Sequence, residues 1–136
     1  MKIASWNVNS IKARLEHVKT WLDAQKPDLL MIQELKGLEF PDNDFTEMGY
    51  KTKEVTQKAY NGVALISRHE INIIHTSLPG SRAVNDGSDE QASYIEADIN
   101  GLRFINIYMP NGNPVGTEKY TYKLKWMDNL YNRLKE

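Results

Sequence analysis

The spacing of apolar residues along the first part of the chain predicts a strand followed by a helix. Residues 2–8 are predicted to form a strand. Residues 11–25 then carry apolar side chains at helical spacing, namely Ile11, Leu15, Val18 and Leu22. Ser10 or Asn9 stands where a helix N-cap is needed, and Pro27 ends the helix because the residue before a proline avoids helical geometry.

The next apolar run, residues 28–34, is continuous, which is typical of a strand covered on both faces. The opening of the chain therefore predicts a β-α-β unit with parallel strands and a right-handed crossover. Asn7 ends the first strand and Glu34 ends the second. Because the carboxyl ends of parallel strands meet at one edge of a sheet, where ligands are commonly bound, we expect these two side chains to be neighbours.

The remaining pattern is rich in short strands separated by turn residues. Strands are predicted over residues 50–56, 62–68, 71–76, 92–99 and 102–109. Asn61-Gly62 and Asn100-Gly101 are turn signals, residues 43–48 form a short helical turn, and residues 78–90 and 110–116 read as loops. Residues 117–135 form a second amphipathic helix, with one apolar face made of Tyr120, Leu124, Met127, Tyr131 and Leu134.

Composition supports a single globular domain of the α/β class. The 136 residues are 40% hydrophobic, and the formal net charge is -1, which is not the basic footprint of a general nucleic-acid binder. Any nucleic-acid contact would depend on local patches and a metal ion. The absence of cysteine excludes disulfides and thiolate chemistry, and Lys2 is not followed by an apolar signal segment, so a cytoplasmic location is expected.

The candidate metal site consists of Asn7, Asn9 and Glu34. Mg²⁺ prefers oxygen ligands, usually one or two carboxylates with water, and an amide and a carboxylate at adjacent strand ends meet that need. The alternative is structural: the asparagines satisfy turn and cap backbone, and Glu34 is a solvated strand terminus. The residues alone leave both interpretations open.

A second group of candidates surrounds this edge. Tyr108, near the end of a strand, can hydrogen-bond a phosphate or transfer a proton, or it can be an ordinary sheet aromatic. Lys36, Lys12 and Arg14 lie beside the edge and the start of the first helix, where phosphates bind well, although solvated surface charge is the simpler alternative. The histidines lack metal-ligand spacing, and the tryptophans are interpreted as packing residues.

Several short blocks, in order along the chain, resemble one family. They are Ser5-Trp6-Asn7-Val8-Asn9-Ser10, Ile32-Gln33-Glu34-Leu35-Lys36, Asn61-Gly62-Val63-Ala64-Leu65-Ile66-Ser67 and Ile107-Tyr108-Met109-Pro110-Asn111-Gly112. Together they resemble exonuclease III and the apurinic/apyrimidinic endonucleases of the endonuclease/exonuclease/phosphatase superfamily. The resemblance covers nearly all of the chain.

The resemblance implies a four-layer α/β sandwich, of which this chain is expected to form half. We expect residues 1–136 to be the N-terminal half of such a domain, with one mixed β-sheet of about six strands and helices on its outer face. The family's second half carries GDxN and SDH motifs, which are absent here. Without that half, the inner sheet face should be exposed, so a homodimer with its sheets face to face is expected.

The resemblance also implies roles for individual residues. Glu34 matches the metal-binding glutamate, Asn7 the asparagine beside the metal and phosphate, and Tyr108 the active-site tyrosine. Asn9 stands where some relatives carry a metal-linked aspartate. The expected DNA or phosphate contacts are Lys36, Lys12, Arg14, Asn61, Gly62, Asn111 and Gly112.

The function implied for the intact parent is DNA repair with Mg²⁺ or Mn²⁺ as cofactor. The expected reaction is hydrolysis of the phosphodiester 5′ to an abasic site in double-stranded DNA, with related 3′-exonuclease and 3′-phosphatase activities. The chain alone is expected to be catalytically incomplete, because removing groups that act as a unit costs orders of magnitude in rate. The alternatives are a phosphatase or phosphodiesterase of the same superfamily, and a non-catalytic fragment serving as an assembly or DNA-binding module.

Overall fold

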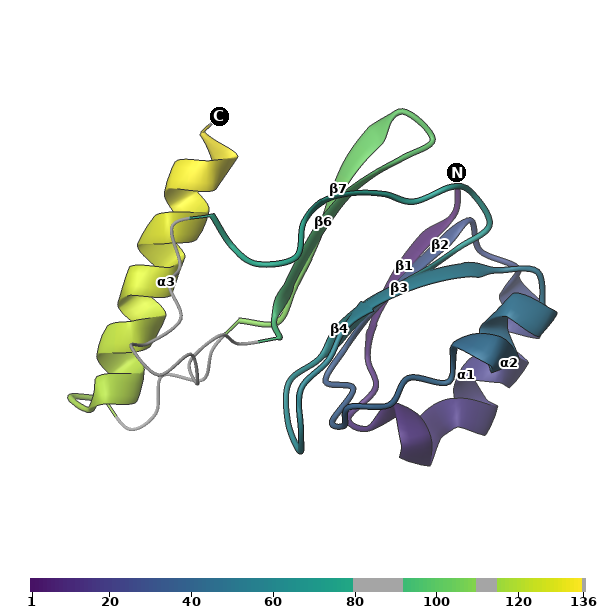
Figure 1. Ribbon diagram of the computed structural model, residues 1–136, viewed down its shortest axis with the longest axis horizontal. Helices are drawn as coiled ribbons and strands as arrows, with labels where there is room; N and C mark the ends of the chain where they lie inside the picture. The colour runs from purple at the N-terminus through teal and green to yellow at the C-terminus, as the bar shows by residue number, and fades with distance from the viewer. Residues whose placement is uncertain (80–91, 110–114, 136) are drawn as a thin grey trace.

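The computed structural model describes residues 1–79, 92–109 and 115–135, which form four layers (Figure 1). The first layer consists of two helices and the second of a four-stranded sheet. A three-stranded sheet and a third helix form the other two layers. In chain order the elements are β1 (Ile3–Asn7), α1 (Ile11–Gln25), β2 (Leu29–Gln33), α2 (Asp42–Glu47), β3 (Lys51–Val55), β4 (Val63–Ser67), β5 (Asn72–His75), β6 (Tyr94–Ile99), β7 (Leu102–Ile107) and α3 (Glu118–Leu134). The α/β class and the predicted elements are confirmed, with ends shifted by a few residues.

The first sheet has the strand order β1-β2-β4-β3. Strands β1 and β2 are parallel, as predicted, with Asn7 opposite Gln33. Strand β4 runs antiparallel to β2, so the start of β4 lies at the same edge as the ends of β1 and β2. Ser10 is the N-cap of α1, since its Oγ accepts the N–H of Ala13 at 3.2 Å.

The prediction of one mixed sheet of about six strands is wrong, because the strands separate into two sheets. Strands β5, β6 and β7 form their own antiparallel sheet, in that order, facing the first one. Periodicity reports which side of a strand is apolar, but it carries no information about which strands share backbone hydrogen bonds. The chain therefore holds part of both sheets of a sandwich rather than one complete sheet.

The inner faces of the two sheets cover each other, so the exposed face on which the predicted homodimer rested is absent. The apolar layer between them consists of buried residues from both sheets, namely Leu29, Val63, Leu65, Ile95, Ala97 and Ile99. Burying this surface between the sheets removes it from water in the single chain. The physical reason for face-to-face dimerisation of the sheets is therefore lost.

Helix α3 packs on the outer face of the second sheet, and it uses a different face from the one predicted. Trp126 is 3% exposed and packs with Tyr94, with Tyr122 and Leu130 beside it. The predicted apolar face points outward instead, with large exposed side chains at Leu124, Met127, Tyr131 and Leu134. The helix carries apolar residues on two sides, and only docking on the sheet selects one of them.

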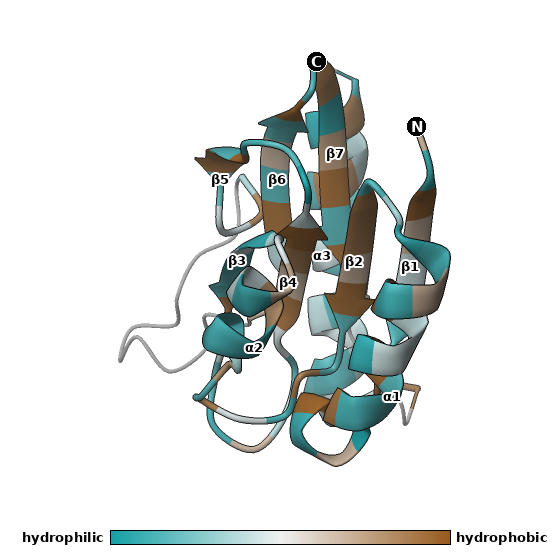
Figure 2. Ribbon diagram, turned by 90° about the vertical axis from the view of Figure 1, so that its right-hand side faces the viewer, coloured by the Kyte–Doolittle hydropathy of each residue, from teal (hydrophilic) through white to brown (hydrophobic). Residues whose placement is uncertain are grey.

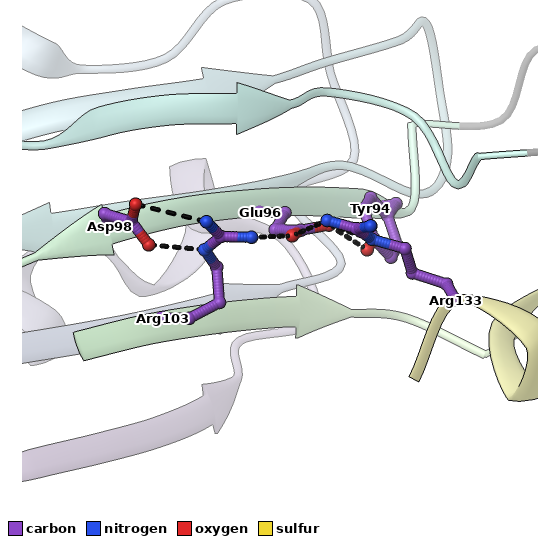
Figure 3. A network of polar contacts seen from close by, with 5 residues as sticks. All are labelled: Tyr94, Glu96, Asp98, Arg103 and Arg133. Atoms are coloured by element: carbon purple, nitrogen blue, oxygen red, sulfur yellow. Dashed lines mark hydrogen bonds and ion pairs between the residues drawn. The ribbon is translucent and has the colours of Figure 1, made fainter. Parts of the chain in front are cut away.

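A buried ionic cluster holds the end of α3 against the sheet (Figure 3). Glu96 of β6, 1% exposed, receives hydrogen bonds from Arg133 of α3, from Arg103 of β7 and from the Tyr94 hydroxyl. Arg103 also pairs with Asp98. The cluster therefore joins three elements through one carboxylate.

Among the described residues, no helix combines the length and apolar character needed to cross a bilayer.

Candidate active site at the strand ends

The carboxyl ends of β1, β2 and β7 and the start of β4 come together at one edge of the sandwich. Asn7 ends β1, and Glu34 directly follows β2. The Asn7 Nδ2 donates to Glu34 Oε1 at 3.0 Å, so these two side chains are neighbours, as the β-α-β pattern predicts. The Asn7 Oδ1 accepts the backbone N–H of Asn9 at 3.1 Å, which gives both asparagines a turn-forming role as well.

The backbone at this edge is held in the left-handed region at several residues other than glycine. They are Asn9, Ser10, Glu34, Lys36, Ala59 and Asn61. Each such residue costs on the order of 1 kcal/mol or more, and such strain is concentrated at functional sites. Backbone hydrogen bonds hold the start of α1 against the turn after β2, from Ser10 N to Glu34 O at 2.8 Å and from Ile11 N to Leu35 O at 3.1 Å.

The Glu34 carboxylate is the centre of the site. Hydrogen bonding from Asn7 lowers its pKa most, the Tyr108 hydroxyl and nearby Lys36 lower it further, and partial burial opposes them. The Lys36 Nζ lies 3.6 Å from Glu34 Oε2. Because its pKa is below the ordinary value, Glu34 is ionised at neutral pH and presents a negative charge in a half-buried position.

Tyr108 reaches the same carboxylate from the second sheet. Its hydroxyl donates to Glu34, and this hydrogen bond together with burial raises the pKa of the phenol above its usual range. Its backbone N–H donates to Ser93 O at 2.9 Å, which extends the β6–β7 pairing past the end of β7. The phenol therefore stays protonated at neutral pH, so it is available as a hydrogen-bond donor.

The loop over residues 56–62 is packed along the Glu34–Lys36 turn. Lys36 N donates to Asn61 O at 2.9 Å, and Leu35 N donates to Gly62 O at 3.2 Å. The Gln57 Oε1 accepts from Asn61 Nδ2 at 2.9 Å and from Ala92 N at 2.7 Å. Asn61 and Gly62 thus lie beside Lys36 at the predicted site edge.

Substitutions in this loop should change stability in opposite directions. Gly62 has φ +97, and an added Cβ would lie 2.7 Å from the Cβ of buried Leu35, so Gly62→Ala should destabilise the chain by roughly 2–4 kcal/mol. Ala59 has φ 73 and is exposed, so Ala59→Gly should relieve strain and stabilise it by roughly 0.5–1 kcal/mol. Urea unfolding of both variants measures the change in the free energy of unfolding. Changes of the same sign and size in the two variants would show that backbone conformation is not what makes these positions differ.

Of the remaining predicted phosphate contacts, two lie in the described part of the chain and two lie outside it. Lys12 and Arg14 lie in the first turn of α1, directly after the cap that contacts Glu34 and Leu35. Their backbone is therefore near the site edge. Asn111 and Gly112 lie outside the described residues.

The side chains at this edge offer Mg²⁺ one carboxylate and a neighbouring amide. Within the described ranges, no group of three or more histidine, aspartate or glutamate side chains is arranged to hold a metal ion. Glu34 is an ionised carboxylate beside an amide, and Mg²⁺ binds with one or two carboxylates while keeping several waters. The residues present fit one carboxylate of such a site.

Sequence reasoning missed two side chains at this edge, Gln33 and Asn106. Asn106 is 2% exposed, and its Oδ1 accepts from Gln33 Nε2 at 2.8 Å across the gap between the sheets. The available signal was a polar amide inside the apolar strand Phe104-Ile105-Asn106-Ile107. A buried amide in such a strand needs a partner, and that requirement predicts a cross-sheet contact.

Comparison with known proteins finds relatives of this chain along nearly its whole length. Residues 4–135 match the Endonuclease/Exonuclease/phosphatase family. The chain is 30% identical over 143 residues to the exodeoxyribonuclease III of Haemophilus influenzae, covering 100% of this chain and 52% of that protein. It therefore spans about half the length of that relative.

Solved structures also match this chain over about half of their own length. An AP endonuclease from Archaeoglobus fulgidus matches with a TM-score of 0.86 and 40% identity, over 97% of this chain and 50% of that one. A 3′ phosphatase from Neisseria, bound to a product DNA hairpin, matches with a TM-score of 0.87 and 39% identity. The match covers 96% of this chain and 49% of that one. The four-layer arrangement is thus shared with these proteins.

Proposed function

Because the chain belongs to the endonuclease/exonuclease/phosphatase family, we propose that it forms the N-terminal half, residues 1–136, of a metal-dependent DNA-repair nuclease of the exonuclease III type. The observation that carries this proposal is the meeting of Glu34, Asn7 and Tyr108 at one edge. It is supported by relatives named exodeoxyribonuclease III and AP endonuclease.

The proposed reaction is hydrolysis of the phosphodiester on the 5′ side of an abasic site in double-stranded DNA. Water adds to phosphorus, the P–O3′ bond breaks, and the leaving oxygen takes a proton. One fragment then ends in a 3′-hydroxyl, and the abasic sugar keeps a 5′-phosphate. Removal of a 3′-terminal nucleotide or of a 3′-phosphate is the same chemistry at a chain end.

The residues of the site have separate roles in this proposal. The Tyr108 hydroxyl, kept protonated, donates its single proton to Glu34 in this structure, and with DNA bound it donates that proton to a phosphate oxygen instead, as negative charge develops there. Lys36, Lys12 and Arg14 bind backbone phosphates, and the N-terminus of α1 adds its own favourable dipole. Asn61 and Gly62 contact the DNA, and the same role is proposed for Asn111 and Gly112, which lie outside the described residues.

Glu34, with Asn7 and Asn9 beside it, would hold Mg²⁺ or Mn²⁺. A divalent ion bound there supplies Lewis-acid polarisation of the phosphate. Glu34 contributes the negative charge that attracts the ion, and Asn7 orients the carboxylate through its hydrogen bond to Oε1. Lys36 and Tyr108 fix the carboxylate from its other sides.

Both sheets end in an unpaired strand on the side of the sandwich that carries Asn7 and Tyr108, which supports the proposal that a second half completes the site. Strand β1 is an end strand of the first sheet, β7 is an end strand of the second, and both lie on the same side (Figure 2). Unpaired strand edges are templates for further strands. The second half would supply the carboxylate that activates water, together with more metal ligands.

The test is cleavage of a duplex that contains one abasic-site analogue. The chain is assayed alone and mixed with the second half of the Archaeoglobus fulgidus AP endonuclease, each with Mg²⁺ and with EDTA. We expect no nick from the chain alone and a metal-dependent nick with a 3′-hydroxyl from the mixture. Nicking by the chain alone would overturn its proposed incompleteness.

Two other outcomes would point to the alternatives. Hydrolysis of small phosphomonoesters without any nick would identify a phosphatase of the same family. DNA binding without turnover in a folded, assembled mixture would identify a non-catalytic module. Either result would overturn the nuclease proposal.

A further inference from the structure

We infer that Asn106 and Gln33 are positioning residues: an amide pair between the two sheets, with Asn106 buried and Gln33 partly buried, that fixes Tyr108 against Glu34. This inference rests on the proposed function only for the purpose that the Tyr108–Glu34 contact serves. The contact itself, and the amide pair beside it, are features of the fold.

Asn106 uses the hydrogen-bonding groups of its side chain to bind the opposite sheet. Its Nδ2 donates to Ile32 O of β2 at 3.0 Å and to Ala64 O of β4 at 2.8 Å. Its Oδ1 accepts from Gln33 Nε2 at 2.8 Å. One side chain of β7 is therefore tied to two neighbouring strands of the other sheet.

Gln33 extends this connection to the edge of the first sheet. Its Nε2 also donates to Ser5 Oγ of β1 at 3.0 Å. The amide chain thus spans β1, β2, β4 and β7, which are the strands whose ends carry the site. All three side chains lie in or directly at the space between the sheets.

The amide pair stands in an otherwise apolar layer. Apolar contacts between sheets are non-directional, so they allow small sliding movements at little cost. Hydrogen bonds with fixed partners are directional, and a buried amide that loses them is left unsatisfied at a cost of about 1–3 kcal/mol. The pair therefore opposes sliding of one sheet over the other at this point.

The position of the pair in the sequence connects it to the site. Gln33 directly precedes Glu34, and Asn106 stands two residues before Tyr108. No residue separates Gln33, the last residue of β2, from Glu34, and only Ile107, the last residue of β7, separates Asn106 from Tyr108, so little backbone freedom lies between the pair and the two site side chains. Since Glu34 and Tyr108 belong to different sheets, their contact depends on the register that the pair sets.

The test measures placement rather than turnover, with the 136-residue chain itself. Tyrosine and glutamate are isotope-labelled, and the nuclear Overhauser effect between the Tyr108 ring and the Glu34 side chain is recorded by NMR. The variants Asn106→Leu and Gln33→Met remove the link with little change in side-chain volume. Asn72→Leu, an exposed asparagine in β5 of the same sheet, is the matched control.

We expect the Tyr108–Glu34 signal to be lost in both variants and retained in Asn72→Leu. The signals of Tyr94 and Trp126, on the outer face of the sheet, should stay unchanged, which separates a local shift from unfolding. A wild-type Tyr108–Glu34 signal in either folded variant would overturn the inference. Unfolding of both variants would also overturn it, because the pair would then be needed for folding rather than for placement.

Failure of this inference is distinguishable from failure of the proposed function. A Tyr108–Glu34 signal that survives in folded variants removes the positioning role and leaves the nuclease proposal untouched. An assembled enzyme that does not need Glu34 removes the nuclease proposal, while the NMR result still reports how the two sheets are aligned.

Discussion

Replacing Glu34 with glutamine should lower the rate of abasic-site cleavage by the assembled enzyme by about 10²–10³-fold. Glutamine keeps the size of the side chain and one acceptor oxygen for Asn7 and Tyr108, so the change removes mainly a negative charge. The Glu34 carboxyl is ionised at neutral pH because hydrogen bonds from Asn7 and Tyr108, and the nearby Lys36, lower its pKa. The measurement is single-turnover cleavage of an abasic duplex at saturating Mg²⁺.

The matched control for this variant is Glu70→Gln. Glu70 is also a glutamate paired with a lysine, since its Oε1 lies 3.4 Å from Lys51 Nζ, but its side chain is 83% exposed. It lies at the other end of β4, after Ser67. Cleavage should be unchanged in Glu70→Gln. A rate for Glu34→Gln equal to that of this control would remove Glu34 from the proposed site.

Replacing Glu96 with glutamine should destabilise the fold by about 3 kcal/mol, near the low end for breaking a buried ion pair. The carboxylate is 1% exposed and is shared by Arg133, Arg103 and Tyr94, so the variant leaves the guanidinium of Arg133 without its buried counter-charge. Arg103 is 44% exposed and is partly solvated by water, which moderates the loss. Urea unfolding, followed by tryptophan fluorescence, measures the change.

A neighbouring carboxylate provides the control for this cluster. Asp98 pairs with the same Arg103, but its side chain is 41% exposed. Asp98→Asn should therefore cost no more than about 1 kcal/mol, as for other surface ion pairs. Equal losses in the two variants would show that burial of Glu96 is not what makes it important.

The pH dependence of stability gives a second check on Glu96. Burial alone would raise its pKa, but hydrogen bonds from Arg133, Tyr94 and Arg103 lower it to about 2. A carboxyl whose folded pKa is depressed stabilises the fold above its unfolded pKa of about 4.3, and that contribution is lost as pH falls toward 2. The acid-induced loss of stability in this window should be smaller in Glu96→Gln than in the wild type.

Local sequence signals predicted the elements and half of the candidate site. The helical spacing of Ile11, Val18 and Leu22, the cap at Ser10 and the stop at Pro27 all act within one segment, and α1 forms as predicted. The same β-α-β pattern placed Asn7 beside Glu34, because parallel strands joined by a helix must end at the same edge. Tyr108 was a candidate from its place near a strand end, with an ordinary sheet aromatic as the alternative, and the resemblance implied its role as the active-site tyrosine.

The arrangement of strands into sheets was decided by the tertiary structure. A strand pattern is equally satisfied by pairing in one sheet or by facing another sheet, because both bury the same apolar side. Which of these occurs depends on backbone hydrogen bonds between distant segments, such as β5 with β6. The tertiary structure also decided which face of α3 is buried. Trp126 packs against Tyr94 and Arg133 pairs with Glu96, so the side of the helix that carries these residues lies on the sheet.

The sequence by itself determined the α/β class, the elements and the meeting of Asn7 with Glu34, because each follows from short-range spacing or from one crossover. Only the tertiary structure decided that Tyr108 reaches Glu34 from a second sheet and that Asn106 binds Gln33 across the gap. These contacts join residues more than seventy positions apart. Their geometry depends on how two sheets align, and no local pattern encodes that alignment.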